Sequence, residues 1–437
     1  MAIKRAEGTK DLLASEALFW TKFRQIAFDL FARYGYSPIE TPVFEKTELF
    51  VRGIGEATDV VTKEMFTVVS GGNLAKLIAG EHVRSDSRFS LRPEGTAGVV
   101  RAIAQNGLLQ EGGAPVKVAY AGPMFRAERP QNGRQRQFNQ VGIECLGADD
   151  PSIDAEGIVM LMRFFEAIGI PQDKMTLLVN TLGDAECRPA YRDALKGYIL
   201  DHAGELCEDC QRRAETNPLR ALDCKEEACT RVMSGAPRIG DFLCDSCKAH
   251  YAQVKSYLDA AGVAYVEDPT LVRGLDYYTR TVFEVQVSVG MDNNQNAIGG
   301  GGRYDKLMAE IGGNDTPGFG WALGYERCKI VLEALGTQML EPEPPALYFA
   351  CVDADQRALA FRLAQQCRDA GIACEFDHQG RSLKAQFKQA DKLGCAQVAV
   401  LGPDEVAAGV VKLRDMATHE EREVPLEGFA ENLSHVI

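Results

Sequence analysis

The sequence of 437 residues has no long apolar run, and this lack excludes two broad classes of protein. No stretch of about 18 apolar residues could form a helix that crosses a membrane, so no membrane partner is expected. The N-terminal residues MAIKRAEGTK are not followed by the apolar segment of a secretory signal peptide. We therefore expect a cytoplasmic protein, and a hydrophobic content of 46% allows it a large core.

Basic residues are few relative to acidic ones. The sequence has 48 Lys and Arg against 62 Asp and Glu, which gives a net charge of −14. Because this charge repels a polyanion at long range, contact with nucleic acid has to come from local basic patches. Internal repeats and low-complexity tracts are also lacking, and the length predicts roughly two or three globular domains.

Cysteine is plentiful, but its distribution argues against a secreted protein held by disulfides. The total of 13 is odd, and six cysteines lie between positions 207 and 247, which favours free thiols or a metal site. Two Cys-x-x-Cys pairs there have the spacing of zinc ligands, and we predict a structural zinc site at Cys207, Cys210, Cys244 and Cys247. Three further residues of ligand type lie nearby: Cys224, Cys229 and His250. A set of reduced thiols in a helical insertion is the alternative.

Four arginines lie in and beside a polar loop that joins two alternating segments in the first half of the chain. Val116–Glu128 and Arg136–Gly147 are predicted to be the two strands of a hairpin. Period-two alternation puts four residues of the second strand on one face: Phe138, Gln140, Gly142 and Glu144. An aromatic ring, an amide and a carboxylate would make a poor core, so this face is interpreted as the floor of a binding site. A solvated hairpin with alternating charges is the alternative.

The residue types around this hairpin favour a nucleotide beside a small polar molecule. A guanidinium such as that of Arg126 can donate two parallel hydrogen bonds to a phosphate, and Phe138 offers a flat face for a base that Arg327 could cover. A further set could bind the ammonium and the polar side chain of an amino acid: Glu94, Thr96, Gln140, Glu144, Tyr277 and Tyr278. For Glu94, placed in the first turn of a helix, capping is the alternative. A nucleotide next to an amino acid implies adenylation.

The remaining pattern predicts mixed α and β structure. A long amphipathic helix is expected at Ser15–Gly35 and a helical, cysteine-rich insertion at 188–258. Alternation resumes at Leu271–Val289 and indicates a mostly antiparallel sheet. The run Gly299–Leu307 lacks the residue order of a phosphate-binding loop, so its glycines are expected to let the backbone pass close beneath a ligand. After a proline-rich linker at 336–345, strands and helices alternate at short spacing, which predicts a small parallel-sheet domain.

Five ordered segments resemble the class II aminoacyl-tRNA synthetases, and among them the histidyl-tRNA synthetase family, over essentially the whole chain. They are YSPIETPVFE, SLRPEGTAG, FRAERPQNGRQRQFNQVGIE, LVRGLDYYTRTVFEV and GFGWALGYER. The resemblance implies an α+β fold: a six-stranded antiparallel sheet with flanking helices and a helical insertion, followed by a small α/β anticodon-binding domain. It also implies a homodimer that attaches L-histidine to its tRNA at the expense of ATP, through a histidyl-adenylate, with release of AMP and diphosphate.

Carried over position by position, the resemblance implies roles for individual residues. The histidine pocket would be formed by Glu94, Gly95, Thr96, Gln140, Glu144, Tyr277 and Tyr278. ATP, taken up with Mg²⁺, would be bound by Arg126 at the α-phosphate, by Glu128 and Arg134, and by Phe138 and Arg327 at the adenine. Arg126 and Arg273 would be the catalytic residues and would also border the histidine, since Arg273 stands where related synthetases position a metal ion.

The local pattern around Arg273 allows a less specific interpretation. Alternation places Arg273 on one strand face with Tyr277, and an ion pair with Asp276 or Glu267 is the alternative to a role in catalysis. Asp276 has the opposite parity and should point away. Because a second arginine in the pocket of Arg126 is costly without an anion, we expect the α-phosphate to satisfy both.

Local basic patches for tRNA are expected in two places. At the tip of the hairpin, Arg129, Gln131 and Arg136 would face the acceptor end. Near the anticodon, a stripe on one helix face would consist of Arg381, Lys384, Lys388 and Lys392. A solvated helix face is the alternative for the stripe.

The expected domain order follows from these segments. A catalytic core would comprise residues 1–187 and 259–335, interrupted by the insertion at 188–258. The linker at 336–345 would lead to an anticodon-binding domain at 346–437. Two other protein classes have distinct signatures: an inactive regulatory subunit should lack the Arg273 segment and the C-terminal domain, and a synthetase for another amino acid should lack LVRGLDYY.

Overall fold

The computed structural model describes residues 3–56, 58–82, 88–110, 112–291, 296–337 and 342–434. The chain divides into two compact units, residues 1–340 and residues 341–437. Within the expected linker, residues 338–341 lie outside the described residues. In the part of the chain that the structure describes, none of the helices has both the length and the apolar character needed to cross a membrane.

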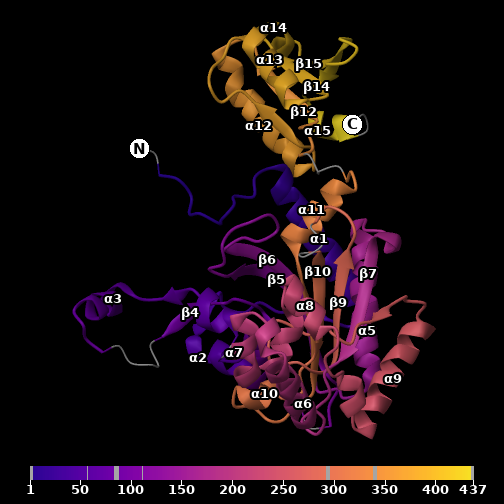
Figure 1. The fold of residues 1–437 in the computed structure, drawn as a ribbon. Helices are drawn as coiled ribbons and strands as arrows, with labels where there is room; N and C mark the ends of the chain where they lie inside the picture. Colours follow the sequence, from indigo (N-terminus) through magenta and orange to yellow (C-terminus); the bar gives the residue numbers. More distant parts are fainter. Residues whose placement is uncertain are drawn as a thin grey trace. The chain divides into compact units, whose positions relative to one another are not determined.

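The first unit is built on a large sheet accompanied by helices (Figure 1). Its helices are α1 (Ser15–Ala32), α2 (Thr47–Ile54), α3 (Gly71–Ile78), α4 (Thr96–Gln105), α5 (Pro151–Ile168), α6 (Arg188–Asp201), α7 (Glu208–Thr216), α8 (Glu227–Met233), α9 (Asp245–Ala260), α10 (Leu307–Glu310) and α11 (Tyr325–Ala334). Its strands are β1 (Ser37–Pro38), β2 (Phe44–Lys46), β3 (Thr67–Val68), β4 (Phe89–Leu91), β5 (Val116–Phe125), β6 (Gln137–Leu146), β7 (Met175–Thr181), β8 (Val266–Glu267), β9 (Thr279–Val287), β10 (Ala297–Arg303) and β11 (Gly318–Gly324). Strands β2, β4 and β3 form a small separate sheet.

The strands of the main sheet lie in the order β1-β5-β6-β11-β10-β9-β7-β8. From β5 to β7 every neighbouring pair is antiparallel, whereas β1 and β8 each add a parallel pair at an edge. The antiparallel sheet that the resemblance implies is therefore confirmed, with one short parallel strand added on each side. An edge suits β1 because Pro38 has no N–H with which to complete a second ladder.

The β5–β6 hairpin carries most of the polar residues of interest. Its register runs from Val116 opposite Leu146 to Phe125 opposite Gln137, so both predicted strands are confirmed with slightly different ends. One face of the sheet packs against α1 and α5, where Trp321 is buried. Because side chains alternate between the faces, the polar residues of β6 are left on the opposite side.

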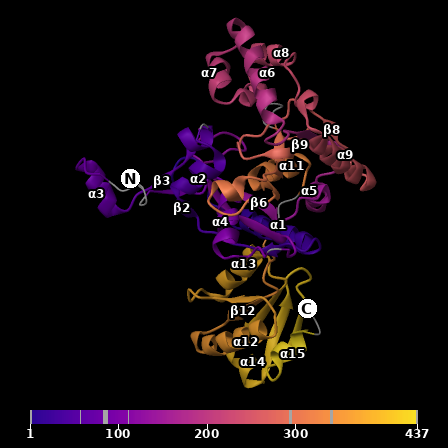
Figure 2. The same ribbon diagram turned by 90° about the horizontal axis from the view of Figure 1, so that it is seen from below.

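The residues between β7 and β9 form the helical insertion that the sequence predicts. Helices α6, α7 and α8 share a core of their own, which includes Tyr191, Cys210 and Met233, and Figure 2 shows them gathered in one lobe. Helix α9 differs, because Val254 and Leu258 are buried in the core of the main sheet and the helix lies against α5 (Figure 1). The lobe that stands apart from the sheet therefore ends before α9.

The alternating segment Leu271–Val289 is only partly a strand. Strand β9 is Thr279–Val287, whereas residues 271–278 form a loop. Side chains of this loop do alternate between two environments, since Tyr277 lines a cavity and Asp276 is bonded by polar side chains of the insertion. The predicted strand is wrong for 271–278. This loop is packed between the cavity and the insertion, so its successive side chains alternate between two environments as they would in a strand.

The second unit contains a five-stranded sheet in the order β13-β12-β14-β15-β16. Its elements are β12 (Leu347–Cys351), α12 (Arg357–Asp369), β13 (Cys374–Phe376), α13 (Leu383–Leu393), β14 (Gln397–Leu401), α14 (Pro403–Ala407), β15 (Val410–Asp415), β16 (Glu421–Pro425) and α15 (Phe429–Ser434). Strands β13, β12 and β14 are parallel, but β15 and β16 are antiparallel. The expected parallel sheet is wrong beyond β14, because only the short α14 follows that strand and parallel pairing needs a longer crossover.

Candidate active site

A cavity of about 170 Å³ opens on the polar face of the main sheet. Seven predicted site residues line it: Glu94, Thr96, Arg126, Gln140, Arg273, Tyr277 and Tyr278. Larger cavities of about 580 and 660 Å³ lie beside the insertion. We take the smaller cavity as the site because polar groups from several strands, a helix N-terminus and the 271–278 loop converge on it.

Glu94 both caps a helix and borders the cavity. Its Oε2 accepts a hydrogen bond from the Thr96 N–H at 2.6 Å, and its Oε1 accepts one from the Ala97 N–H at 3.0 Å. Helix α4 begins at Thr96, so Glu94 precedes the helix and does not lie in its first turn as predicted. Burial raises the pKa of the Glu94 carboxyl, while the two N–H donors oppose that rise. Capping of α4 is confirmed, and it fixes the carboxyl at the cavity wall.

Glu144 lies beneath the cavity and supports it. Its side chain is fully buried; the Thr96 hydroxyl donates to its Oε1 at 2.7 Å and the Tyr304 hydroxyl donates to its Oε2. Burial raises the pKa of this carboxyl well above its usual range, against the effect of both hydroxyl donors. The sequence does not predict Tyr304, because nothing local distinguishes its hydroxyl from one exposed to solvent.

Tyr120 is a second residue of the site that the sequence alone does not single out. It stands opposite Gly142 in the β5–β6 register, and a Cβ at Gly142 would come within 2.5 Å of its ring. A Cβ at Gly95 would also overlap the ring, so both glycines make room for it. Gly142 itself is the signal that could have found Tyr120, because a glycine inside a strand often marks the close approach of a large neighbour.

Two arginines reach the cavity from different elements. Arg126 follows β5 and donates from Nε to the Pro93 carbonyl at 3.0 Å. Arg273 lies in the 271–278 loop and forms an ion pair with Glu284 of β9, with 2.6 Å between Nη1 and Oε2. Burial lowers the pKa of the Arg273 guanidinium, but the Glu284 carboxylate and the hydroxyls of Tyr278 and Tyr277 together outweigh burial, so the pKa is raised overall.

The ion pair with Glu284 corrects the sequence-based expectations for Arg273. The predicted alternatives, Asp276 and Glu267, are wrong, because Glu267 accepts from Lys255 at 2.9 Å. Asp276 points away from the cavity as its parity predicted and bonds residues of the insertion. The arginine is therefore held by a carboxylate of β9, the strand that directly follows its loop.

Three buried polar atoms of residues that line the cavity have no hydrogen-bond partner among the described residues. They are the Tyr120 hydroxyl oxygen, Gln140 Oε1 and Arg273 Nε. A buried donor or acceptor left unpaired costs about 1–3 kcal/mol. An unpaired acceptor and an unpaired donor at one cavity favour a ligand that carries groups of both kinds.

Beyond the cavity, the hairpin holds its cationic residues through protein contacts. Arg134 Nη1 donates to Glu128 Oε2 at 2.8 Å, and the Arg126 guanidinium carbon lies 5.3 Å from the ring centroid of Phe138. Arg327, at the start of α11, donates from Nη1 to a carbonyl of β10 at 2.6 Å. The cation over the Phe138 ring is thus Arg126, and stacking of a base between Phe138 and Arg327 stays a prediction.

Comparison with known proteins decides the family. The family model described as histidyl-tRNA synthetase matches residues 8–328, and the model of an anticodon binding domain matches residues 347–435. The chain belongs to the histidyl-tRNA synthetase family. Its two matched segments fall one in each compact unit.

Relatives of this histidyl-tRNA synthetase family member match over nearly the full length. A histidine–tRNA ligase of Anaeromyxobacter dehalogenans is 46% identical over 99% of this chain and 100% of the relative, and one of a Geobacillus species is 43% identical over 99% of each. The crystal structure of apo histidyl-tRNA synthetase from S. aureus is similar with a TM-score of 0.80, 35% identity and 99% coverage of both chains. A Bacillus halodurans protein described as an ATP phosphoribosyltransferase regulatory subunit/histidyl-tRNA synthetase has a TM-score of 0.61 and 19% identity, covering 92% of this chain and 98% of that one, so this likeness shows the fold alone.

The residues of this synthetase family member that were predicted to meet tRNA at the hairpin differ in exposure. Arg129 and Gln131 are exposed at the tip. Arg136 is half-buried; its backbone N–H donates to the Gly8 carbonyl at 2.8 Å and its Nε donates to the Glu128 carbonyl at 3.3 Å. Two of the three residues are thus free to meet a large partner, and the third ties the hairpin to the N-terminal segment.

The basic stripe of the second unit is shorter than predicted. Lys384, Lys388 and Lys392 are exposed on α13, one helical turn apart. Arg381 precedes the helix and pairs with Asp377, with 3.7 Å between Nη1 and Oδ1. The predicted place of Arg381 on the helix face is wrong, because α13 begins at Leu383.

The cysteines of the insertion form two groups and not one. One group consists of Cys207, Cys210, Cys224 and Cys229, and the other of Asp184, Cys187, Cys244 and Cys247. The predicted set is wrong in its grouping, because each Cys-x-x-Cys pair gathers its own partners from elsewhere in the chain. His250 belongs to neither group; its Nε2 lies 3.5 Å from a carboxyl oxygen of buried Asp154.

Proposed function

We propose that the chain is a histidine–tRNA ligase that works through a histidyl-adenylate. The cavity carries this proposal: an unpaired carbonyl oxygen on Gln140, the Glu94 carboxyl and two arginines converge on a space of about 170 Å³. An amino acid presents an ammonium group to acceptors and a carboxylate to cations, and a polar side chain to hydroxyls such as that of Tyr277. Family membership supports histidine as that amino acid.

In the first step, the histidine carboxylate attacks the α-phosphorus of ATP in line, and diphosphate leaves. Negative charge gathers on the non-bridging phosphate oxygens, which we place between the guanidinium groups of Arg126 and Arg273. Because Arg126 is held by the Pro93 carbonyl and Arg273 by Glu284, both charges are oriented before the substrates arrive. Glu128, Arg134, Phe138 and Arg327 are proposed to bind the rest of ATP, which is taken up with Mg²⁺ as substrate.

In the second step, a ribose hydroxyl at the 3′ end of the tRNA attacks the carbonyl carbon of the adenylate. The histidyl ester forms and AMP leaves with the phosphate charge still facing Arg126. No side chain of the protein has to form a covalent bond, so catalysis rests on positioning and electrostatics.

Selectivity for histidine follows from the polar character of the proposed pocket. Glu94 and Gln140 are proposed to hold the ammonium group, while Tyr277, Tyr278 and the Thr96–Glu144 pair face the imidazole. A site built to hydrogen-bond its substrate rejects an apolar analogue by roughly 10⁴ to 10⁵, because its own polar groups are then left unpaired. Histidine is therefore selected without a separate editing reaction.

Histidine-dependent exchange of labelled diphosphate into ATP tests the proposal. We expect exchange with L-histidine and, at equal concentration, none above background with the other amino acids. Exchange with a different amino acid would assign the chain to another synthetase. Absence of exchange with every amino acid would favour an inactive regulatory relative.

The proposal extends to partners and place. We propose a homodimer, a cytoplasmic location where tRNA is charged, and contact of tRNA with Arg129 and Gln131 and with the α13 stripe. The proposed domains are a catalytic core interrupted by an insertion at 188–258, a linker at 336–345 and an anticodon-binding domain at 346–437. The insertion is proposed to hold structural zinc.

A further inference from the structure

We propose that this chain binds two zinc ions at separate sites, one inside the insertion and one where the insertion joins the main sheet. Each site has four ligand residues: Cys207, Cys210, Cys224 and Cys229 for the first, and Asp184, Cys187, Cys244 and Cys247 for the second. Within each group, all the potential ligand atoms lie within 4.8 Å of one another. This inference gives the proposed zinc binding its number of ions and its ligands.

The first site has the composition of a structural zinc centre. Four sulfur atoms at about 2.3 Å from a tetrahedral zinc stand about 3.8 Å apart, and the Sγ atoms of Cys207 and Cys224 are separated by 3.9 Å. The Cys207 N–H points at Cys229 Sγ at 3.2 Å, the kind of N–H···S contact that orients and stabilises a thiolate ligand. Because all the cysteines of the chain are free, these thiols are available to a metal.

The second site combines three cysteines with a carboxylate. The Cys244 Sγ lies 4.0 Å from both carboxyl oxygens of Asp184, and the Cys244 N–H donates to Cys187 Sγ at 3.0 Å. Asp184 Oδ1 already accepts N–H groups of the following turn, including that of Cys187 at 3.3 Å, which leaves Oδ2 for a metal. Arg280 lies 3.7 Å from that oxygen and offsets part of the charge of about −2 that three thiolates and a carboxylate leave around Zn²⁺.

The two zinc ions would link different parts of the chain. The first links the turn before α7 with the start of α8, so it closes a lobe whose core is small. The second links the start of α6 with the start of α9, which are the two points where the lobe joins the main body. The apolar core of so small a lobe contributes limited stability, so such links would add appreciably to it.

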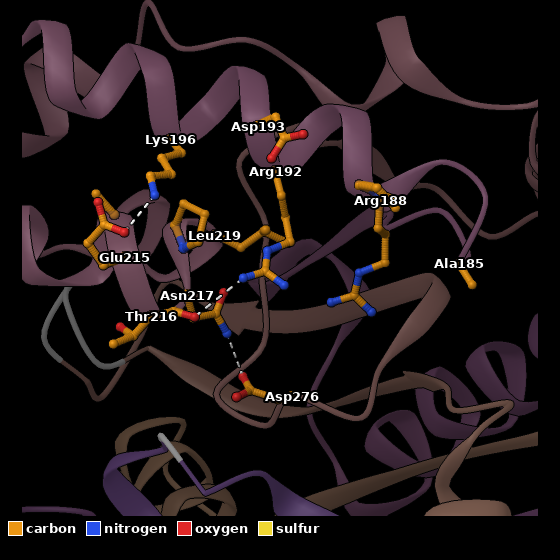
Figure 3. A pocket seen from close by; sticks show the side chains of 13 residues that line it. Ala185, Arg188, Arg192, Asp193, Lys196, Glu215, Thr216, Asn217, Leu219 and Asp276 are labelled. Carbon is orange, nitrogen blue, oxygen red and sulfur yellow. Dashed lines mark hydrogen bonds and ion pairs between the residues drawn. The ribbon is translucent and has the colours of Figure 1, made fainter.

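The second site is one residue away from a contact with the histidine pocket. Cys187 directly precedes Arg188, whose Nη1 donates to the Tyr278 carbonyl at 2.9 Å. Figure 3 shows Arg188 beside a cavity of about 580 Å³, where Asn217 of the insertion bonds Asp276 of the 271–278 loop at 2.9 Å. The zinc ion at Cys187 would therefore fix the lobe that holds this loop in place.

Metal analysis of the full chain, purified without chelator, tests the number of sites. We expect about two equivalents of zinc per chain, and about one in each of the variants Cys224→Ser and Cys187→Ser. Cys351→Ser, which alters a buried cysteine of the second unit, is the matched control and should keep both equivalents. Less than about a tenth of an equivalent in the parent chain, or a single equivalent that Cys187→Ser leaves unchanged, overturns the proposal.

Cobalt titration keeps the test decisive if a cysteine variant fails to fold. Chain stripped of zinc is titrated with Co²⁺ alone, and thiolate-to-cobalt absorption should rise through two equivalents in the parent chain. The variant Asp184→Asn keeps the size of the side chain but removes the charged ligand, so in the presence of a weak chelator its absorption should stop at one equivalent. A full second equivalent in Asp184→Asn overturns the assignment of this carboxylate.

The effect on histidine binding separates this inference from the proposed function. Chelation of the second ion should raise KM for histidine several-fold in diphosphate exchange, with kcat less affected, and added zinc should restore it. A chain that exchanges diphosphate but contains no zinc overturns the metal sites and leaves the ligase activity standing. A chain that contains two zinc ions but shows no histidine-dependent exchange overturns the ligase activity and leaves the metal sites standing.

Discussion

Arg273 and Glu284 form an ion pair across two elements, with 2.6 Å between Nη1 and Oε2. The loop that carries Arg273 has no ladder bonds to the sheet, so the position of the arginine depends on a carboxylate of β9. A Cβ at Gly300, on the adjacent strand β10, would stand 2.9 Å from Arg273 Nη1. The glycine and the carboxylate together place one cationic group at the cavity before any anion binds.

The first prediction concerns the charge that Arg273 supplies. Arg273→Ala should slow adenylate formation by about 10² to 10³, because it removes about 3 to 4 kcal/mol of transition-state stabilisation. Transfer of histidine from preformed adenylate should suffer less, since diphosphate has by then left. Rapid-quench measurement of the two half-reactions checks this.

Glu284→Gln is the matched control for that prediction. It keeps the shape of the partner but weakens the hold on Arg273, so adenylate formation should fall by less than in Arg273→Ala. Equal losses in both half-reactions of Arg273→Ala, or a loss confined to histidine affinity, would show that Arg273 only binds the substrate or supports the structure of the site.

The second prediction separates stability from binding at Gln140. Its Oε1 is buried without a partner, so Gln140→Leu should stabilise the ligand-free protein by up to about 1 kcal/mol. The same change removes the proposed acceptor for the histidine ammonium and should raise KM for histidine roughly 10- to 100-fold. Urea denaturation without ligands and diphosphate exchange measure the two effects. A loss of stability, or an unchanged KM, contradicts the assignment.

The third prediction concerns the close packing of β11 on Glu144. A Cβ at Gly320 would overlap the Glu144 carboxyl and stand 2.5 Å from the Ile143 carbonyl oxygen. Gly320→Ala should therefore destabilise the protein by about 1–3 kcal/mol and weaken histidine binding through the displaced carboxyl. In Gly324→Ala, on the same strand, the nearest atom lies 3.9 Å away, so this control should unfold at nearly the parental temperature. Equal melting temperatures for both variants would contradict the packing argument.

The fourth prediction is a pH dependence of stability at His250. Burial lowers the pKa of this imidazole below its ordinary value of 6.5, with Asp154 opposing and Arg303 and Arg280 assisting the shift, while Asp149 also opposes it. The unfolded chain then takes up a proton at a higher pH than the folded chain does. The contribution of His250 is thus present above about pH 6.5 and is lost as the pH falls towards the folded-state pKa.

His250→Gln should flatten the loss of stability on acidification in that window. Denaturation at several pH values between about 7.5 and 5.5 measures the slope. His202→Gln, which alters a half-buried histidine at the end of α6, is measured in parallel as the control. An unchanged slope in His250→Gln would contradict the prediction.

The fifth prediction concerns the α13 stripe. Replacing Lys384, Lys388 and Lys392 by Gln should weaken tRNA binding and lower the salt slope of log Kd by about 1 for each lysine that pairs with a phosphate in the parent complex. The pair Arg362→Gln and Arg422→Gln removes exposed cations elsewhere in the same unit and should change the slope less. Identical slopes for the stripe variant and the parent would leave the stripe as a solvated face.

The sequence predicts the hairpin well because the alternation there arises from one cause, the two faces of a paired strand. In β6 one side of the strand faces the core and the other faces the site, so Gln140 and Glu144 fall together as expected. The same rule misplaces residues 271–278, where Arg273 and Asp276 alternate between the cavity and the insertion without any strand. An alternating sequence pattern shows only that successive side chains lie in two different environments. Pairing of strands in a sheet is one of several structures that produce such a pattern.

Other parts of the site depend on distance in space and are invisible to local patterns. Nothing in the sequence near Glu284 or Tyr304 marks either residue. The 271–278 loop folds back onto β9 and brings Arg273 to Glu284, and the sheet order brings Tyr304 to Glu144. The pairing of the cysteines fails for the same reason. Spacing finds each Cys-x-x-Cys, but Asp184 and Cys187 join Cys244 and Cys247 through the fold.

The contact between Cys187 and Cys244 also shows where the lobe begins and ends on the main body. The Cys244 N–H lies 3.0 Å from Cys187 Sγ, so the lobe between them leaves and re-enters the main body at nearly one point. A short turn could span that gap, and modules are gained, lost and exchanged most readily at such places. Replacing the lobe by a short turn would leave the pairing of β7 with β9 in place, but the loop that carries Arg273 would lose its contacts with Asn217 and Arg220.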